Sequence, residues 1–280
     1  MVLLNGKLLP ETQAHMTMAN RGLLYGDAVF ETLRFQDNKI LFWEDHYFRL
    51  MSSMRIMRME IPMDFTMEVL GDQIDSVIKS HDASNSYAVK LFVYRNANGK
   101  YTPDSNDVGY FIKATPLNNA FYLIDDQPYT VELFKDHYVM GDLLSTIKSN
   151  NKAINVLGSI FAKENGYDNC LLLNHDKQVI EALNANLFLV KGTVIKTPPL
   201  TSGCLNGILR NQLIKMIGKL PDYTLEEAPI SPFELQKADE LFITNTLIGI
   251  KSIRQYRKKE YETKVARNLL GKLNAQIRLS

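Results

Sequence analysis

The chain has 280 residues, of which 45% are hydrophobic and 22% charged, and its formal net charge at pH 7 is +1. A chain of this length can bury a large core, in two modest domains or one large one. Its interspersed charges form no basic stretch for nucleic acid, so small molecules are the expected partners.

Cysteine usage and the first residues bear on the cellular compartment. Cys170 and Cys204 stand in apolar surroundings and cannot build a disulfide framework, which favours a reducing compartment. Residues 1–7 lack the charged and apolar segments of a signal peptide. No run of about 18 apolar residues could form a membrane span. We therefore expect a cytoplasmic protein that does not enter a membrane.

The N-terminal part of the chain predicts mixed strands and helices. Asn5-Gly6 between apolar residues is typical of a tight hairpin turn. Leu50, Met54 and Met57 recur at helical spacing. The expected elements are a hairpin over 2–9, a strand over 29–35, helices over 43–59 and from Asp64 onward, and strands over 87–95 and 109–114 flanking a polar loop at 96–107.

The C-terminal part predicts more strands and four helices. Residues 116–127 are turn-prone and poorly periodic, which favours an interdomain linker. Ser231-Pro232-Phe233-Glu234 is a capping box with proline at the first helical position. The expected elements are strands over 129–134 and 170–174, a hairpin over 187–196, and helices over 153–164, 208–217, from 232, and over 263–279.

Several short segments carry residues that could react with or bind a cofactor. Lys148 offers an amine and Glu181 a carboxylate. Asn206 is expected to cap a helix, and Gly207 would let the backbone approach a ligand closely. Pyridoxal 5'-phosphate (PLP) needs an amine for its aldehyde, a carboxylate for its ring nitrogen and a rigid anion site, such as a helix N-terminus, for its phosphate.

In this order, the segments resemble the class IV aminotransferases, which are PLP enzymes of fold type IV. The resemblance runs from about Asn5 to about Ser252. The matching motifs are Glu181-x-x-x-x-Asn186-Leu187-Phe188, Ile195-x-Thr197-Pro198-Pro199, Gly203-Cys204-Leu205-x-Gly207-Ile208-x-Arg210, the run 21–34 and His46-x-x-Arg49-Leu50. The resemblance implies an α+β fold with a smaller N-terminal α/β domain over 1–115, a linker over 116–127 and a larger β-barrel-like PLP-binding domain over 128–280.

The resemblance also implies roles toward the cofactor. Lys148 would form the Schiff base with PLP and move the Cα proton, with Lys152 as the competing lysine. Glu181 would pair with the pyridine nitrogen, and Arg49 would bind the phosphate in bidentate fashion. The other implied cofactor-binding residues are Asn186, Gly207, Ile208 and Leu209, the last two through backbone N–H groups, and Thr246.

Substrate recognition is implied for a tyrosine near the N-terminus and for basic residues around one strand and its loop. The candidates are Tyr25, Lys90, Arg95, Tyr101 and Asn245, the last through its backbone amide. Lys90 and Arg95 are five residues apart, so they point to opposite faces of a regular strand. We therefore expect one of the two to be structural.

The family resemblance leaves two activities open. One is transfer of an amino group between an amino acid of branched-chain type and a 2-oxo acid. The other is the lyase reaction that releases pyruvate and 4-aminobenzoate from 4-amino-4-deoxychorismate for folate synthesis. Residues 245–250 look more like the lyase segment, and Ala153 stands where branched-chain members often carry a tyrosine. Both reactions begin with proton loss at Cα, so the residues do not separate them.

Readings outside these activities are less consistent with the sequence. A non-catalytic PLP-binding relative would have no need for both Lys148 and Glu181. There is no Gly-x-Ser-x-Gly elbow, and the five histidines show no metal-ligand spacing, so neither a hydrolase nor a metal site is expected. The resemblance implies a homodimer and leaves open which subunit supplies the loop over 96–101.

Overall fold

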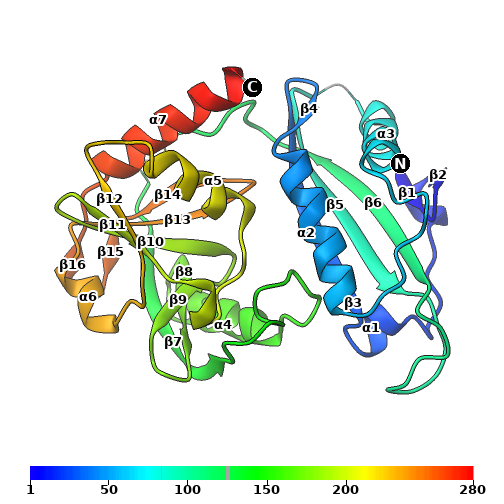
Figure 1. The fold of residues 1–280 in the computed structure, drawn as a ribbon, viewed down its shortest axis with the longest axis horizontal. Helices are drawn as coiled ribbons and strands as arrows, with labels where there is room; N and C mark the ends of the chain where they lie inside the picture. Colours follow the sequence, from blue (N-terminus) through cyan, green and yellow to red (C-terminus); the bar gives the residue numbers. More distant parts are fainter. Residues whose placement is uncertain (83, 124–126, 280) are drawn as a thin grey trace. The chain divides into compact units, whose positions relative to one another are not determined.

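The computed structural model describes residues 1–82, 84–123 and 127–279, which form two compact units, each with its own sheet (Figure 1). Unit 1 comprises Met1–Ala120 and Ile147–Asn151, and unit 2 comprises Phe121–Thr146 and Lys152–Ser280. Residues 147–151, expected in the C-terminal domain, belong to unit 1 instead, because this segment is hydrogen-bonded to a unit 1 strand. Residues 124–126 of the expected linker lie outside the described residues.

Unit 1 is built on a six-stranded antiparallel sheet in the order β2-β1-β6-β5-β3-β4. Its strands are β1 (Val2–Leu4), β2 (Lys7–Leu9), β3 (Ala28–Gln36), β4 (Lys39–Ile40), β5 (Ser86–Arg95) and β6 (Val108–Pro116). Its helices are the short 3₁₀ turn η1 (Glu11–Gln13), α1 (Arg21–Leu24), α2 (Trp43–Ile56) and α3 (Met67–Lys79).

The two faces of this sheet differ, because side chains alternate along each strand. One face packs against α2 and α3, where Leu33 and Leu91 meet Leu50, Met54 and other apolar helix residues in one core. The opposite face carries a row of aromatic rings. Phe92 stacks on Phe30 at 6.4 Å and on Phe111 at 5.0 Å between ring centroids.

Local backbone chemistry explains where the first elements turn and end. The hairpin over 2–9 is confirmed, with Asn5 and Gly6 both at positive φ. Helix α2 ends at Ile56 rather than at 59, since Arg58 adopts a left-handed conformation. Helix α3 begins after Thr66, whose side chain accepts a hydrogen bond from the Val69 amide, and not at Asp64.

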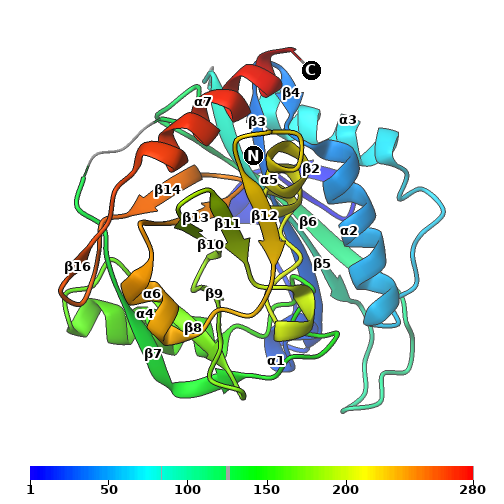
Figure 2. The same cartoon turned by 60° about the vertical axis from the view of Figure 1, so that its left-hand side comes forward.

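Unit 2 is built on a ten-stranded mixed sheet in the order β12-β11-β10-β9-β8-β7-β15-β16, with the pair β13 and β14 joined to β10 (Figure 2). Its strands are β7 (Thr130–Val139), β8 (Asn169–Asn174), β9 (Val179–Ala182), β10 (Ala185–Lys191), β11 (Val194–Thr197), β12 (Thr224–Glu227), β13 (Glu240–Asn245), β14 (Gly249–Ile253), β15 (Gln255–Tyr256) and β16 (Lys259–Glu260). Its helices are α4 (Ala153–Glu164), η2 (Leu200–Ser202), α5 (Ile208–Ile217), α6 (Pro232–Lys237) and α7 (Lys264–Leu279).

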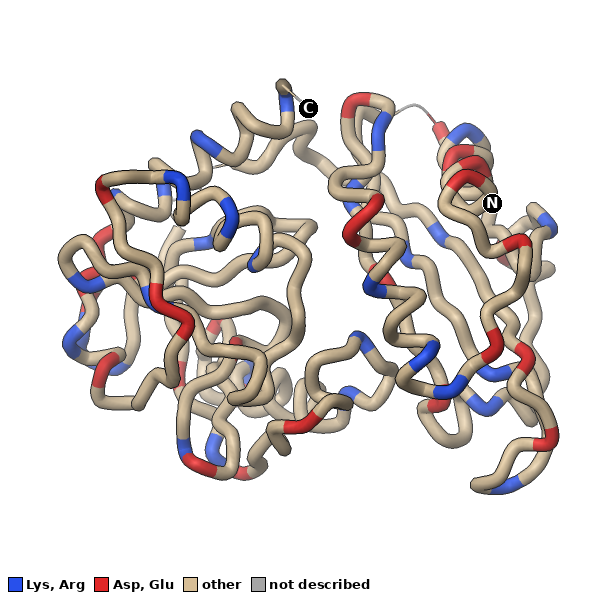
Figure 3. The backbone as a smooth tube through the Cα atoms, in the orientation of Figure 1, with Lys and Arg blue, Asp and Glu red and all other residues tan. Residues whose placement is uncertain are grey.

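The helices of unit 2 cover its strands. Helix α4 packs on β7 and β8, where Ala162 meets Phe134 and Leu172. Helix α5 contacts β12 and β13, and α7 contacts β13 and β14. The capping box at the start of α6 is confirmed, with both reciprocal hydrogen bonds between Ser231 and Glu234. Lys and Arg alternate with Asp and Glu along both units (Figure 3).

Candidate active site

Lys148 is fixed to unit 1 through its backbone. The segment Ile147–Asn151 runs antiparallel to the start of β3. The Phe30 amide donates to the Lys148 carbonyl, and the Asn150 amide donates to the Ala28 carbonyl, both at 2.9 Å. The Lys148 Nζ lies 4.6 Å from the centre of the Phe30 ring. The amine therefore projects from a firmly held strand-like segment onto the aromatic face of the sheet.

The competing lysine belongs to a different element. Lys152 begins α4 in unit 2, where it is the N-terminal capping residue and makes no side-chain cap. Burial lowers the pKa of Lys152, and the charge of Glu181 opposes that shift. Lys152 thus offers a partly buried amine near the Glu181 carboxylate, on a different element from the one that carries Lys148.

Arg49 lies on α2 and is paired with a carboxylate inside unit 1. Its Nε donates to Glu31 Oε1 at 2.8 Å, and its Nη2 donates to Glu31 Oε2 at 2.5 Å. The ring nitrogen Nδ1 of His46 lies 2.7 Å from the same Oε2. Arg49 holds the pKa of the buried Glu31 carboxyl at about 2, against the opposing effect of burial.

The resemblance gave no separate role to Glu31 or His46, although both stand inside its motifs. One sequence signal could have indicated them. Glu31 lies two residues from Val29 and two from Leu33 on β3, so its side chain shares their face of the strand. That face is turned to the apolar core of unit 1. A carboxylate in such a position requires partners that neutralise it.

Glu181 and Asn186 face each other across neighbouring strands of unit 2. They are paired in register on β9 and β10. The Leu205 amide donates to Glu181 Oε2 at 2.9 Å, and Asn186 Nδ2 donates to the Leu205 carbonyl at 2.8 Å. Both side chains thereby hold the turn that leads into α5.

The start of α5 differs from the expectation. Gly207, not Asn206, is the capping position, and this glycine provides no side-chain cap. Asn206 instead accepts from Asn211 through its side-chain oxygen at 2.8 Å. The prediction of an Asn206 cap was therefore wrong. Ile208 and Leu209 occupy the first helical positions, so their amides do not take part in the i to i−4 pattern.

Thr246 and Asn245 form the turn between β13 and β14. Thr246 is buried, and its carbonyl accepts from the Tyr122 hydroxyl at 2.6 Å. The side-chain oxygen of Asn245 accepts from the Leu247 and Ile248 amides, each at 2.9 Å. Asn245 thus shapes this turn with its own side chain.

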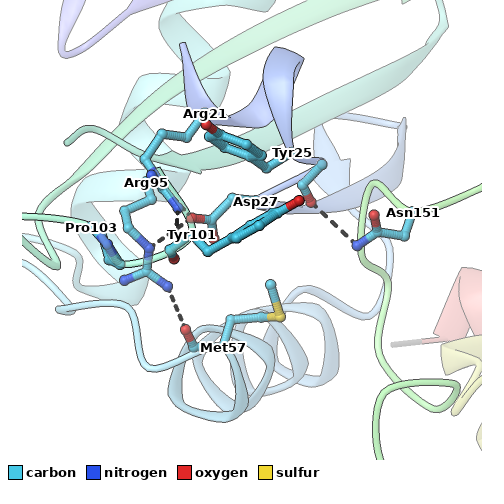
Figure 4. A pocket seen from close by; sticks show the side chains of 9 residues that line it. Arg21, Tyr25, Asp27, Met57, Arg95, Tyr101, Pro103 and Asn151 are labelled. Carbon is cyan, nitrogen blue, oxygen red and sulfur yellow. Dashed lines mark hydrogen bonds and ion pairs between the residues drawn. The ribbon is translucent and has the colours of Figure 1, made fainter. Parts of the chain in front are cut away.

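Three of the expected substrate residues meet at one pocket of unit 1. Tyr25, Arg95 and Tyr101 line a hollow of about 270 Å³ (Figure 4). Asn151, at the end of the Lys148 segment, also lines this pocket. The other lining residues are Arg21, Gly26, Asp27, Met57 and Pro103.

The guanidinium groups of the two arginines at this pocket donate hydrogen bonds to other groups of the protein. Arg95 donates from Nε to Asp27 at 2.9 Å, from Nη1 to the Arg58 carbonyl and the Asn106 side chain, and from Nη2 to the Met57 carbonyl. These bonds use four of the five N–H groups of a guanidinium. Arg21 also contacts Asp27 at 2.9 Å and donates to the loop carbonyls of residues 99–101. Arg95 therefore has a structural role.

Lys90 points to the face of the sheet opposite to that of Arg95 and does not line this pocket, which lies at the end of the sheet where β3 begins and β5 ends. The alternation along β5 predicts that Lys90 and Arg95 point apart. The structure confirms it, since Lys90 approaches the Phe30 ring at 4.8 Å while Arg95 contacts the end of α2. Lys90 is exposed. It shares the Phe30 ring with Lys148, so two ammonium groups lie near one aromatic side chain.

The residues present fit PLP. Arg49 and the amides at the start of α5 are donors suited to a phosphate, Glu181 is an acceptor for a ring N–H, and Lys148 is an amine. A β-carbon on Gly207 would overlap the side-chain oxygen of Asn186, so only glycine leaves the helix start in this position. Among residues 1–82, 84–123 and 127–279, no group of three or more His, Cys, Asp or Glu could hold a metal ion. No helix in the described ranges is long and apolar enough to cross a membrane.

Comparison with known proteins agrees with this chemistry. A "Putative branched-chain-amino-acid aminotransferase" of Methanocaldococcus jannaschii is 32% identical over 252 residues, which cover 89% of this chain and 85% of that protein. The aminodeoxychorismate lyase of Vibrio harveyi is 25% identical over 273 residues, covering 95% and 97%. The PLP form of the branched-chain amino acid aminotransferase from Thermobaculum terrenum has the same fold, with 24% identity, a TM-score of 0.87 and coverage of 99% and 93%.

The family relationship rests on most of the chain. Residues 28–256 match the model of the family described as "Amino-transferase class IV". This span includes Lys148, Glu181 and Arg49. The enzymes of this family are PLP-dependent. The chain therefore belongs to the class IV aminotransferases and is a PLP-dependent enzyme.

Proposed function

We propose that the chain transfers an amino group between an apolar amino acid of branched-chain type and a 2-oxo acid, with 2-oxoglutarate as a natural acceptor. The pocket beside the Lys148 segment is the observation that carries this proposal. Its surface offers the rings of Tyr25 and Tyr101 together with Met57, while the N–H groups of Arg21 and Arg95 are turned to protein oxygens. Such walls suit an apolar side chain better than a carboxylate.

The cofactor roles follow from the donor and acceptor chemistry. PLP, when bound, supplies an electron sink that stabilises negative charge at the substrate Cα. Lys148 Nζ would hold the cofactor through its aldehyde and would carry the proton of the substrate Cα. Glu181 would keep a proton on the ring nitrogen. Arg49 and the groups at the start of α5 and at Thr246 would bind the phosphate, with Asn186 and Gly207 shaping the helix start.

Lys90 is our candidate for the substrate carboxylate. Its exposed ammonium group stands at the Phe30 ring that Lys148 also approaches, on the aromatic face of the unit 1 sheet. A cation there attracts an amino-acid carboxylate toward the catalytic amine. Tyr25 and Tyr101 flank the side chain of the substrate, and the Asn245 amide is a further donor for its carboxylate.

One observation favours the lyase as the second candidate. The Asn245 turn, in which one side-chain oxygen caps two amides, occurs in the segment that looks like aminodeoxychorismate lyases. 4-Amino-4-deoxychorismate carries more than one carboxylate, as 2-oxoglutarate does, and the arginines of the pocket are already bonded within the protein. The second carboxylate of either molecule would therefore depend on Lys90 for charge neutralisation.

Substrate assays on the PLP-loaded protein separate the two activities. One assay follows glutamate formation from L- and D-amino acids with 2-oxoglutarate, and the other follows 4-aminobenzoate release from 4-amino-4-deoxychorismate. We expect glutamate formation with leucine, isoleucine or valine, and no 4-aminobenzoate. The variant Lys148→Ala is the blank for both assays. Release of 4-aminobenzoate without glutamate would replace the proposal with the lyase reading.

We also propose that the enzyme is a cytoplasmic homodimer, as its family resemblance implies. Size-exclusion chromatography with light scattering on the holoenzyme gives the oligomeric state directly. A mass of about 64 kDa, twice the 31.9 kDa of one chain, is the expected result, and a monomer would contradict it. Cell fractionation tests the compartment.

A further inference from the structure

The carboxylate of Glu31 is the centre of a buried cluster in unit 1. We propose that Glu31 and His46 are positioning residues, which hold Arg49 in the orientation that binds the cofactor phosphate. The inference rests on the proposed function, because it takes Arg49 as a phosphate ligand. The inference goes beyond the proposed function, because it gives a positioning role to two residues that are not themselves phosphate ligands.

The contact between Glu31 and Arg49 fixes the plane of the Arg49 guanidinium group as well as pairing its charge. The two hydrogen bonds, at 2.8 and 2.5 Å, come from the Nε and Nη2 edge of the guanidinium. Bidentate pairs of this kind restrict both position and rotation of the group. The side chains of Glu31 and Arg49 are 1% and 9% exposed, so solvent does not compete for the bonds. The orientation of Arg49 is therefore set by β3.

His46 restrains the same carboxylate through the Oε2 oxygen that Arg49 Nη2 also contacts. Its ring is fully buried, and burial lowers its pKa, so the imidazole is neutral. A carboxylate only accepts hydrogen bonds, so the His46 Nδ1 carries the proton donated to Glu31. The other ring nitrogen, Nε2, has no hydrogen-bond partner among the described residues. The only polar contact of this buried ring seen in those residues is thus the one to Glu31.

Helix α2 and strand β3 bring His46, Arg49 and Glu31 together so that only a carboxylate at position 31 can accept all the hydrogen bonds. His46 and Arg49 stand three residues apart on one face of α2. Glu31 accepts from three N–H groups, namely Nε and Nη2 of Arg49 and Nδ1 of His46. A glutamine would place its NH₂ group against one of these donors. The substitution Glu31→Gln therefore removes the anchor while keeping the size of the side chain.

Loss of a purely structural ion pair would change ligand binding differently from loss of a pair that positions Arg49. Loss of a structural pair weakens unit 1 as a whole, so it would reduce binding of any ligand. Loss of a positioning pair affects the phosphate selectively. Pyridoxal, which lacks the phosphate but keeps the aldehyde and ring, provides the comparison.

The experiment measures binding of PLP and of pyridoxal to the apoprotein by absorbance titration, for wild type, Glu31→Gln, His46→Leu and His46→Asn. We expect Glu31→Gln and His46→Leu to weaken PLP binding about tenfold or more, with pyridoxal changed by less than about twofold. In His46→Asn the amide N–H can replace Nδ1–H, so near-normal PLP binding is expected. Binding of inorganic phosphate, followed by ³¹P NMR, should weaken in parallel with PLP.

A second Glu–Arg pair, in unit 2, serves as a control, with its carboxylate partly exposed: the Glu227 side chain is 45% exposed. Glu227 pairs with the buried Arg210 at 2.6 Å, so Glu227→Gln breaks another Glu–Arg pair with no proposed phosphate role. Equal weakening of PLP and pyridoxal in the Glu31 and His46 variants, or unchanged PLP binding, would overturn the inference alone. A wild-type protein that binds PLP no better than pyridoxal would overturn the inference and the phosphate assignments on which it rests.

Discussion

Gly207 and Asn186 are in such close contact that the first cannot carry a side chain while the second keeps its place. A β-carbon on Gly207 would overlap Asn186 Oδ1, and the same amide group holds the Leu205 carbonyl through Nδ2 at 2.8 Å. The backbone of Gly207 has φ of −73°, which any residue can adopt. The requirement for glycine therefore comes from space and not from backbone conformation.

Gly207→Ala should consequently destabilise the protein and weaken PLP retention. We expect a loss of about 1–3 kcal/mol in the free energy of unfolding, measured by urea denaturation, because Asn186 must move and give up its bond to Leu205. Adding Asn186→Ala should recover part of the loss, so the two changes should not be additive. Additive effects would contradict the contact.

Gly271→Ala is the matched control for this prediction. Gly271 lies within α7, and a β-carbon there meets nothing within 4 Å. Alanine in a helix interior is favoured over glycine by about 0.5–1 kcal/mol, so this variant should gain stability. A loss in both variants would show that the Gly207 effect is not specific.

Lys148 and Lys152 can be separated by their spectra. Lys148→Ala should lose the visible absorbance of the lysine-bound cofactor and nearly all turnover, because the amine held against β3 is removed. Lys152→Ala, which alters the N-terminal residue of α4, should keep the absorbance. Borohydride reduction of the holoenzyme followed by peptide mass spectrometry identifies the bonded lysine. Cofactor found on Lys152 would reverse the assignment.

Glu31 should make stability depend on pH in the acid range. Its pKa is lowered in the folded protein to about 2 from a usual value of 4.5, so the unfolded chain takes up the proton more readily between these values. The stabilisation is present above pH 4.5 and is lost as the pH falls toward 2. Its size is on the order of 3 kcal/mol, given about 1.4 kcal/mol for each pKa unit.

The measurement is urea denaturation of wild type and Glu31→Gln at several pH values from 7 to 2. The difference in their free energies of unfolding should shrink as the pH falls. Glu11→Gln is the control, since the pKa of Glu11 is lowered mainly by its exposed contact with Lys113. A constant difference between wild type and Glu31→Gln across the range would contradict the assignment.

Motif order and alternation predict a good part of this protein from sequence. Glu181 and Arg49 stand in recognisable motifs, and strand alternation is enough to separate Lys90 from Arg95. Contacts between distant segments could not be predicted in this way. The assignment of Ile147–Asn151 to unit 1 depends on hydrogen bonds to β3, more than 100 residues earlier. The cap of α5 shifts to Gly207 for the same kind of reason, because Asn186 and Glu181 hold the preceding turn.

Asp27 joins two arginines, and its loss should free the loop that they hold. Arg21 Nε and Arg95 Nε both donate to Asp27 Oδ2 at 2.9 Å, and Arg21 also donates to the carbonyls of Gly99 and Lys100. Asp27→Asn leaves two buried guanidinium groups facing a neutral amide. Breaking a buried ion pair in this way costs about 3–5 kcal/mol. The arginine contacts to the loop over 96–107 should weaken with it.

Urea denaturation measures the stability change, and limited trypsin digestion reports on the loop through cleavage after the exposed Lys100. Asp239→Asn provides the control, because Asp239 pairs with Lys191 at 2.8 Å on the surface, where ion pairs are worth about 0–1 kcal/mol. Faster cleavage after Lys100 in Asp27→Asn but not in Asp239→Asn is the expected result. Unchanged cleavage in Asp27→Asn would mean that the loop is held without the arginine network. Arg95 would then have to be reconsidered as a substrate ligand.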